Sequence, residues 1–156
     1  MARIKSQGTQ VFAVVDGAVV RFSATKAFSF GEDSFSKIDV TDLDSDMKDY
    51  DRGLRDPGEG SVQINFDDEN TSHLKMLELA ESGDKVDWYI GSSHSKTPPT
   101  YAALTGIDLP EDRTWWSFKG YLSSSAPTVE TDTMIGYTFK LVRTSAVTVT
   151  PRTVTP

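Results

Sequence analysis

The chain has 156 residues, 37% of them hydrophobic and 10% aromatic, which suits one globular domain with a sizeable core. The absence of cysteine excludes disulfide scaffolds, thiol catalysis and cysteine-rich zinc sites. The formal net charge of -7 is the opposite of a nucleic-acid-binding footprint, so the protein is expected to repel phosphates.

At its start, the polar stretch MARIKSQGTQ leads into no apolar signal-peptide core, and no later stretch is apolar enough to span a bilayer. The product is therefore expected in the cytoplasm when made, or exported by a route that the N-terminus does not show, without membrane insertion. Two apolar runs, residues 11–15 and 18–22, then flank Asp16-Gly17, a dipeptide suited to a tight hairpin turn. Further extended segments are expected at residues 26–30 and 35–40.

Residues 39–60, DVTDLDSDMKDYDRGLRDPGEG, concentrate aspartates ahead of a Pro-Gly turn. A calcium-binding EF-hand loop needs acidic ligands at positions one, three and five, Gly at six and Glu at twelve. Asp42, Asp44 and Asp46 fit the first three positions. Met47 and Gly53 stand where the Gly and the Glu are required, so the EF-hand interpretation fails. An irregular calcium cage stays open as an alternative to the favoured interpretation, a solvated or partner-facing loop.

Four later segments alternate apolar and polar residues, which is typical of strands with one buried face: SVQINFD (61–67), KVDWYIG (85–91), TWWSFKGYL (114–122) and TMIGYTFKLV (133–142). Between the first two, Leu74, Leu77 and Ala80 fall at helical spacing. Residues 70–72 offer N-caps and Gly83 ends this helix. The pattern predicts a mainly β fold, a β-sandwich or barrel, with one flanking α-helix.

Two segments lack a core pattern. Residues 91–112 contain Pro98-Pro99 and Pro110, which predicts a long surface loop. The Thr/Pro-rich end, residues 146–156, is expected to be a flexible tail after a single domain at residues 1–145.

Candidate catalytic residues are few. His73, in the first helical turn, is expected to be solvated or to act in capping. His94 lies beside Ser92, Ser93 and Ser95, but neighbours in a flexible loop rarely hold a nucleophile and a base in geometry, and no G-x-S-x-G turn is present. No catalytic residue, metal site or cofactor is therefore expected.

The tryptophans are interpreted by the face of the strand on which they fall. Trp88 and Trp116 fall on apolar strand faces and are expected in the core. Trp115 points to the opposite face, so it is the candidate interface aromatic.

The order of these parts resembles the major tail tube protein of long-tailed, non-contractile bacteriophages of the lambda type. The residues that carry the resemblance are IDVTDLD (38–44), GLRDPGEGSVQINFD (53–67), LELAESGD (77–84) and FKGYLSSS (118–125). No single motif is specific, but the combined order is, and it spans residues 8–143.

The resemblance implies a structural virion protein whose fold is a β-sandwich with one helix. Copies would join into hexameric rings that stack into a tube for DNA ejection, assembled in the host cytoplasm. The implied partners are further copies of the chain, a tape-measure protein, the tail tip or baseplate, and a tail terminator, with non-specific passage of DNA through the lumen. Some relatives carry an extra C-terminal immunoglobulin-like domain, whereas this chain stops at Pro156 just after its linker-like tail. The outer decoration is therefore expected to be absent, or supplied elsewhere.

In this family a long loop between two strands reaches a neighbouring subunit or ring, and residues 41–57 fit that place. The loop mixes acidic, basic and apolar side chains, which suits an interface between copies better than a calcium cage. The expected interface residues are Thr41, Asp42, Leu43, Asp44, Asp46, Met47, Lys48, Asp49, Tyr50, Asp51, Arg52, Leu54, Arg55 and Asp56.

Two competing functions stay open. Exposed aromatics and acids suggest a calcium- or carbohydrate-binding β-sandwich module. An unrecognised hydrolase has only His94 and scattered acids to support it.

Overall fold

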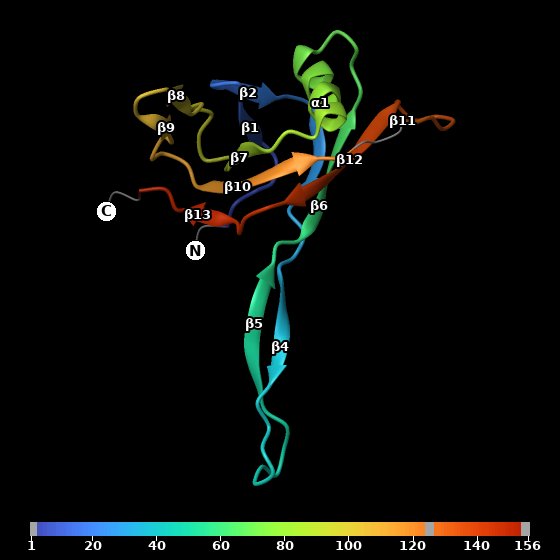
Figure 1. The fold of residues 1–156 in the computed structure, drawn as a ribbon. Helices are drawn as coiled ribbons and strands as arrows, with labels where there is room; N and C mark the ends of the chain where they lie inside the picture. Colours follow the sequence, from blue (N-terminus) through green and yellow to red (C-terminus); the bar gives the residue numbers. More distant parts are fainter. Residues whose placement is uncertain (1–2, 124–126, 154–156) are drawn as a thin grey trace.

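A curled antiparallel sheet with a long projecting hairpin makes up most of the protein, as the computed structural model shows for residues 3–123 and 127–153 (Figure 1). The main sheet has nine strands, in the path β2-β1-β7-β10-β12-β6-β3, with β11 paired to β12 and β13 paired to β10. Their bounds are β1 Gln10–Val15, β2 Ala18–Phe22, β3 Thr25–Ser29, β6 Glu59–Asn65, β7 Val86–Gly91, β10 Trp115–Leu122, β11 Pro127–Thr128, β12 Gly136–Arg143 and β13 Thr148–Thr150.

The sheet curls back on itself because its two edge strands are consecutive in the chain. Only Ser23 and Ala24 separate β2 from β3, although these strands lie at opposite ends of the path. The curl brings Phe28 of β3 over β7, with its ring centre 6.2 Å from that of Trp88. Side chains from both ends of the sheet thereby share one core, so the prediction of a mainly β, barrel-like fold with one helix is confirmed.

The turns and most strands lie where the alternation predicts them. Asp16 and Gly17 adopt φ values of 53° and 75°, the left-handed conformations that a tight hairpin turn requires, and they join β1 to β2. Val62 and Ile64 of β6 are buried on either side of Gln63, and Phe139 and Leu141 of β12 on either side of the exposed Lys140. The predicted alternation is therefore confirmed in these two strands, whereas β3, like the segment predicted at residues 35–40, fully buries no side chain.

The single helix, α1 (Thr71–Ser82), covers one end of the core. Asn70 caps its first turn by accepting from the Ser72 amide, and Gly83 ends it in the left-handed conformation with φ 70°. Met76 and Leu79 are buried against the sheet, and Leu77 and Ala80 are partly buried. Leu74, expected on the same apolar face, is exposed, because the buried face of the helix is centred on His73, Met76 and Leu79. Among the residues that the structure describes, no helix is long and apolar enough to cross a membrane.

His73 is not solvated, which corrects the expectation for this residue. Its side chain is fully buried, and its Nε2 lies 2.8 Å from the carbonyl oxygen of Ser23 in the β2–β3 corner. Its Nδ1 accepts a hydrogen bond from the Asp67 amide at 3.1 Å. His73 therefore ties the start of the helix to the corner that closes the sheet, a contact between segments that sequence spacing does not reveal.

Two segments predicted to be irregular contain strands. Within residues 91–112, β8 (Thr100–Ala102) pairs with β9 (Gly106–Asp108) in a small hairpin. Within the predicted flexible tail, β13 pairs with residues 115–117 of β10, and Val147 packs against the core. Residues 148–150 thus belong to the main sheet, whereas residues 124–126, part of the FKGYLSSS motif, and the last residues of the tail, 154–156, lie outside the described residues.

Trp115 is buried, so the expectation that it offers an interface aromatic is wrong. It does point to the face opposite Trp116, as the alternation predicts, because Trp116 lies with Ile90 against the core. However, Phe12 and the buried guanidinium of Arg113 cover that opposite face. The ring centre of Phe12 lies 5.7 Å from that of Trp115, and the Arg113 Cζ lies 4.9 Å from the Trp115 ring centre. The Trp115 indole donates to the carbonyl oxygen of Pro110 at 2.9 Å.

Candidate assembly interface

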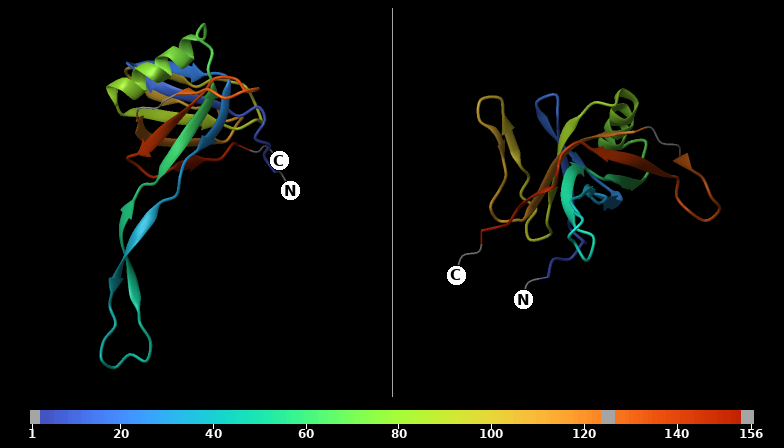
Figure 2. Two further views of the ribbon diagram at one scale, coloured as in Figure 1. Left: turned by 90° about the vertical axis from the view of Figure 1, so that its right-hand side faces the viewer. Right: turned by 60° about the horizontal axis from the view of Figure 1, so that its bottom comes forward.

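A long hairpin leaves the curled sheet and extends away from it, in line with β3 and β6 (Figures 1 and 2). It consists of β4 (Ser34–Asp39), β5 (Tyr50–Asp56) and the residues between them, and is called the arm below. Residues 41–57 are predicted to form a loop, which is correct only for the tip. Tyr50–Asp56 instead form a strand that pairs with β4, because the apolar and basic side chains there stack across the hairpin.

At the base of the arm, two chain segments pass so closely that only glycine fits. A Cβ atom added at Gly31 would lie 2.1 Å from the carbonyl oxygen of Glu59, and one at Gly58 would lie 2.2 Å from that of Glu32. Gly31 also adopts a φ of 75°, which side chains rarely permit. The Pro-Gly pair seen in the sequence therefore serves this close crossing, where the arm joins the sheet.

An ionic clamp fixes the direction of the arm at this crossing. Asp33 accepts hydrogen bonds from the guanidinium groups of Arg143, on β12, and Arg55, on the arm itself. Arg143 is buried and also donates to the carbonyl oxygen of Phe30 at 2.8 Å. Hydrogen bonds from Arg143 and then from Arg55 hold the pKa of Asp33 below its usual value, so the carboxylate stays ionised.

The stem of the arm has no core of its own and is held by cation–π stacking across its strands. The guanidinium carbon of Arg52 lies 3.7 Å from the ring centre of Phe35, and that of Arg55 lies 5.5 Å from it. Further out, the Lys37 ammonium lies 5.3 Å from the Tyr50 ring centre. Such contacts stabilise exposed pairs by about 0.5–1 kcal/mol each, which keeps the two strands together without burying them.

The tip of the arm, residues 40–49, is closed by local hydrogen bonds. Thr41 and Asp49 form two hydrogen bonds with each other. The Asp49 amide donates to the Thr41 hydroxyl at 2.8 Å, and the Thr41 hydroxyl donates to the Asp49 carbonyl oxygen at 3.3 Å. The Asp42 carboxylate accepts from the Ser45 hydroxyl at 2.7 Å and from the Asp44 amide at 3.1 Å. The Thr41 amide also donates to the Asp39 carboxylate at 2.9 Å, and this hydrogen bond lowers the pKa of Asp39.

The surface of the arm is exposed throughout, although many of its side chains are apolar. Every residue from 36 to 52 is exposed, and Leu54 and Met47 are 87% and 78% accessible. Leu43, at the tip, is fully exposed. The tip also carries four aspartates and a single lysine, Lys48. An exposed apolar surface framed by charge on a fixed extension is what a binding surface requires.

The remaining candidates for chemistry are a metal site and the Ser92–His94 pair. Across residues 3–123 and 127–153 no three acidic or histidine side chains gather in a way that could hold a metal ion. The Ser92 hydroxyl does lie 2.8 Å from Nδ1 of His94, so the structure brings this pair together. Ser92 is fully buried, however, and its hydroxyl already accepts from the Thr114 amide at 3.0 Å. Its geometry is that of a loop anchor beside Arg113, which donates to the Ser92 carbonyl.

Comparison with known proteins identifies the family of this chain. The family model described as phage tail tube, lambda-like, matches residues 2–153. The chain belongs to the lambda-like family of phage tail tube proteins. It is a structural component of the phage tail, and therefore of the virion.

A curated relative and two solved structures agree with this assignment. Structural protein 3 of Pseudomonas phage PAJU2 is 30% identical over 127 residues, which cover 78% of this chain and 77% of the relative. The SPP1 tail tube is 9% identical with a TM-score of 0.66, covering 96% of this tail tube protein and 80% of that chain. The tail of a gene transfer agent particle is 13% identical with a TM-score of 0.63, covering 96% and 99%. These two likenesses concern the fold.

The sequence predicts the tip residues of the arm as an interface, but it does not reveal the groups that support the arm at its base. Asp33 and Arg143 lie far apart in the chain, and neither stands in a motif. The Pro-Gly pair at residues 57 and 58 predicts only a turn. The one signal in the sequence is the excess of apolar residues among the acids, which favours a contact surface.

Proposed function

We propose that copies of this tail tube protein join into six-membered rings that stack into a tube through which DNA passes into the host. The arm is the element that connects a subunit to another copy. The observation that carries this is the arm's construction: a hairpin clamped at its base by Asp33, Arg55 and Arg143, yet apolar and exposed along its length. A protein that functioned alone would gain nothing from such a surface, because it exposes apolar area to water.

Several findings support the ring-and-tube arrangement. The gene transfer agent tail, which has the same fold, was reconstructed with C6 symmetry. The edges of the main sheet, β2 and β3, also offer unpaired backbone groups for contacts between copies. The net charge of -7 suits a conduit, because a cationic lumen would hold the phosphates of passing DNA.

The partners and the role follow from the same proposal. The tube would assemble on a tail tip or baseplate, enclose a tape-measure protein and end at a tail terminator. Its role is structural and not catalytic. In support of a structural role, the hydroxyl of Ser92 in the Ser92–His94 pair also accepts a hydrogen bond from the Thr114 amide and so anchors its loop. A calcium- or carbohydrate-binding module is less well supported, because the Asp42 carboxylate already serves the fold of the tip.

Shortening the arm tests this proposal. Replacing residues 37–52 by Asn-Gly keeps Asp33 and Arg55 and closes the remaining strands with a two-residue turn. The free energy of unfolding is expected to stay within about 1 kcal/mol of the full-length value, since loop length costs little in closure entropy. Light scattering and negative-stain microscopy at high concentration should then show tubes for the full-length protein and monomers for the shortened one.

A matched pair of point variants controls for the loss of apolar surface in general. Leu43→Ser at the tip of the arm should weaken tube formation, whereas Leu104→Ser, which changes an equally exposed leucine beyond β8, should not. Tubes of normal appearance from the shortened protein would contradict the role of the arm. A full-length protein that stays monomeric at every concentration, with or without a tail tip, would contradict the tube itself.

A further inference from the structure

An apolar hollow of about 460 Å³ opens between β3 on one side and β1, β7 and β10 on the other. Its apolar lining comes from Val11, Ala27, Phe28, Phe30, Ile90 and Trp116. Trp116, Phe28 and Phe30 are only partly buried, although all three pack against the core. Lys26 contributes the only charge to this lining. The hollow thus offers aromatic side chains to an apolar ligand, beside one cation.

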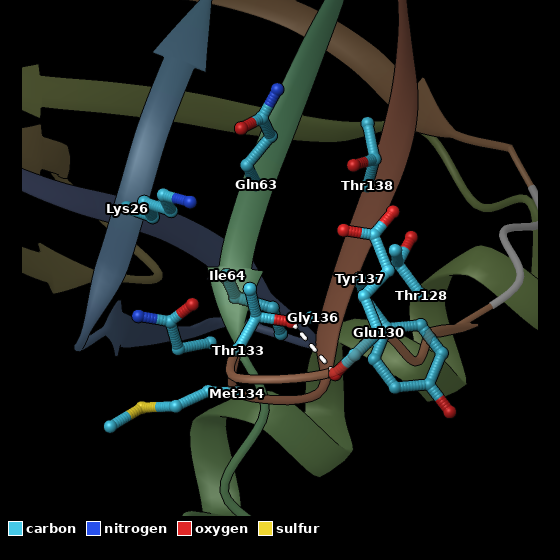
Figure 3. A pocket seen from close by; sticks show the side chains of 11 residues that line it. Lys26, Gln63, Ile64, Thr128, Glu130, Thr133, Met134, Gly136, Tyr137 and Thr138 are labelled. Carbon is cyan, nitrogen blue, oxygen red and sulfur yellow. Dashed lines mark hydrogen bonds between the residues drawn. The ribbon is translucent and has the colours of Figure 1, made fainter.

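A second hollow, of about 220 Å³, differs in chemistry (Figure 3). It lies between β3, β6, β12 and the segment before β12, and polar side chains such as Gln63, Thr133 and Thr138 line much of it. Glu130 adds a negative charge there, and Lys26 lines this hollow as well as the first one. The first hollow has three aromatic side chains and no acidic one, so it suits an apolar and acidic partner better.

The arm of the same chain cannot reach the first hollow. The hollow extends along β3 from Thr25 to Phe30, and Phe30 directly precedes Gly31, where the chain leaves the sheet towards the arm. The arm then extends away from the sheet (Figures 1 and 2). Its exposed tip therefore meets a hollow of this kind only on another copy.

The length of the arm suits such a contact. At about 3.3 Å per residue, the chain from Gly31 to the end of β4 at Asp39 spans roughly 26 Å, and the tip lies beyond it. By the same measure β10, one of the longest strands of the sheet, also spans about 26 Å. An arm of this length can run along the full height of the sheet of a neighbouring copy and place its tip at the far end of that sheet.

Charge and side-chain chemistry also match. The tip presents Leu43 and Met47 among four aspartates and one lysine. The hollow presents aromatic rings and Lys26, which forms no ion pair within the described residues. The N-terminal segment that enters the hollow at Ser6 carries Arg3 and Lys5 and no acid. Methionine is well suited to aromatic surfaces, because its thioether is polarisable and flexible.

We propose that the hollow lined by Phe28, Phe30 and Trp116 receives Leu43 and Met47 from the arm tip of a second copy, with Lys26 facing the aspartates of the tip. This inference rests on the proposed function, since it names the surface that accepts the arm. Insertion removes the apolar side chains of both partners from water, and the charges fix the register between identical copies.

Cross-linking tests the contact directly, because the chain has no cysteine of its own. Leu43→Cys protein is mixed with Ala27→Cys protein, assembled, treated with a short bismaleimide and digested for mass spectrometry. A linked peptide pair joining positions 43 and 27 is expected in tubes and not in dilute monomer. Ala102→Cys, at another exposed alanine in a strand, replaces Ala27→Cys as the matched control and should give no link.

A charge reversal gives an independent readout. Ala27→Glu places a carboxylate at the mouth of the hollow and should abolish tubes while leaving the melting temperature nearly unchanged, because the site is exposed. Adding Asp46→Lys at the tip should restore tubes at least in part. Ala102→Glu, which adds the same charge outside the hollow, should assemble normally.

The outcomes separate the inference from the proposed function. Tubes that link position 43 to position 102 but not to 27, or that tolerate Ala27→Glu, would overturn the hollow as acceptor and leave the tube intact. If Ala102→Glu also abolished assembly, or Asp46→Lys gave no rescue, the specific contact would be refuted as well. If the unmodified protein formed no tubes, the proposed function and this inference would both fail.

Discussion

The curled sheet and the arm use the same antiparallel backbone pairing, yet they place their side chains in opposite environments. In the sheet, β7 and β10 pair with Trp88 fully buried and Phe118 nearly so. In the arm, β4 and β5 pair while every residue from 36 to 52 stays exposed. A hairpin without a covered face is only marginally stable in water. The sheet therefore supplies the stability of the protein, and the arm depends on it.

This difference explains why the arm has such a specific base. The clamp at Asp33 and the close glycine crossing transmit the rigidity of β6 and β12 to a segment that has no core. The cation–π contacts of Phe35 and Tyr50 then hold the strands together further out. The apolar side chains of the arm stay exposed in the single subunit, as the proposed contact with a second copy requires.

The largest effect that separates the two regions is expected at Trp88. This side chain is fully buried, its ring centre lies 5.3 Å from that of Phe22, and its indole donates to the carbonyl oxygen of Gly120. Trp88→Ala should reduce the free energy of unfolding by about 3–5 kcal/mol, since it leaves a large cavity and removes the hydrogen bond of the indole. Chemical denaturation followed by far-UV circular dichroism measures this loss.

The matching change in the arm should leave the free energy of unfolding almost unchanged. Leu43→Ala removes a side chain that is fully exposed, so the free energy of unfolding is expected to change by less than about 0.5 kcal/mol. Equal losses for Trp88→Ala and Leu43→Ala would break the distinction between a stabilising sheet and a dependent arm.

An intermediate, pH-dependent effect is expected where the two regions meet. Because Arg143 and Arg55 hold the pKa of Asp33 below its usual value, ionised Asp33 stabilises the folded state. That contribution is complete above the unfolded pKa of about 3.9 and is lost as the pH falls through the lower folded value. Asp33→Asn should therefore lower the melting temperature at pH 6, and the difference from the unmodified protein should shrink towards pH 2.

Thermal unfolding at a series of pH values measures this shrinking difference. Asp51→Asn is the control, because Asp51 is exposed on the arm and forms no ion pair in the part of the chain that the structure describes. A difference between Asp33→Asn and the unmodified protein that stays constant with pH would show that the clamp acts through packing alone.

The smallest effect is expected at the acidic tip. Millimolar calcium should leave the melting temperature unchanged, because the Asp42 carboxylate already accepts bonds from Ser45 and Asp44. Differential scanning calorimetry with and without calcium measures this. A rise of several degrees that disappears in the Asp42→Ala, Asp44→Ala variant would turn the tip from a contact surface into a metal site.

The sequence by itself determined the local structure of this protein. The alternation of Val62 and Ile64 predicts a strand, the spacing of the apolar residues after Asn70 predicts a helix, and Asp16-Gly17 predicts a tight turn; each of these elements is present. The excess of apolar residues among the aspartates likewise predicts a contact surface at residues 41–56. These signals depend on one strand, one helix or one turn at a time.

Only the tertiary structure decided what covers each surface. Trp115 has the predicted direction but is buried, because Arg113 and Phe12 lie over it. His73 is buried because the β2–β3 corner returns to the helix, and β13 is a strand because β10 leaves residues 115–117 unpaired by β12. Each of these contacts joins residues far apart in the chain, and alternation within a segment carries no information about which distant segment will lie against it.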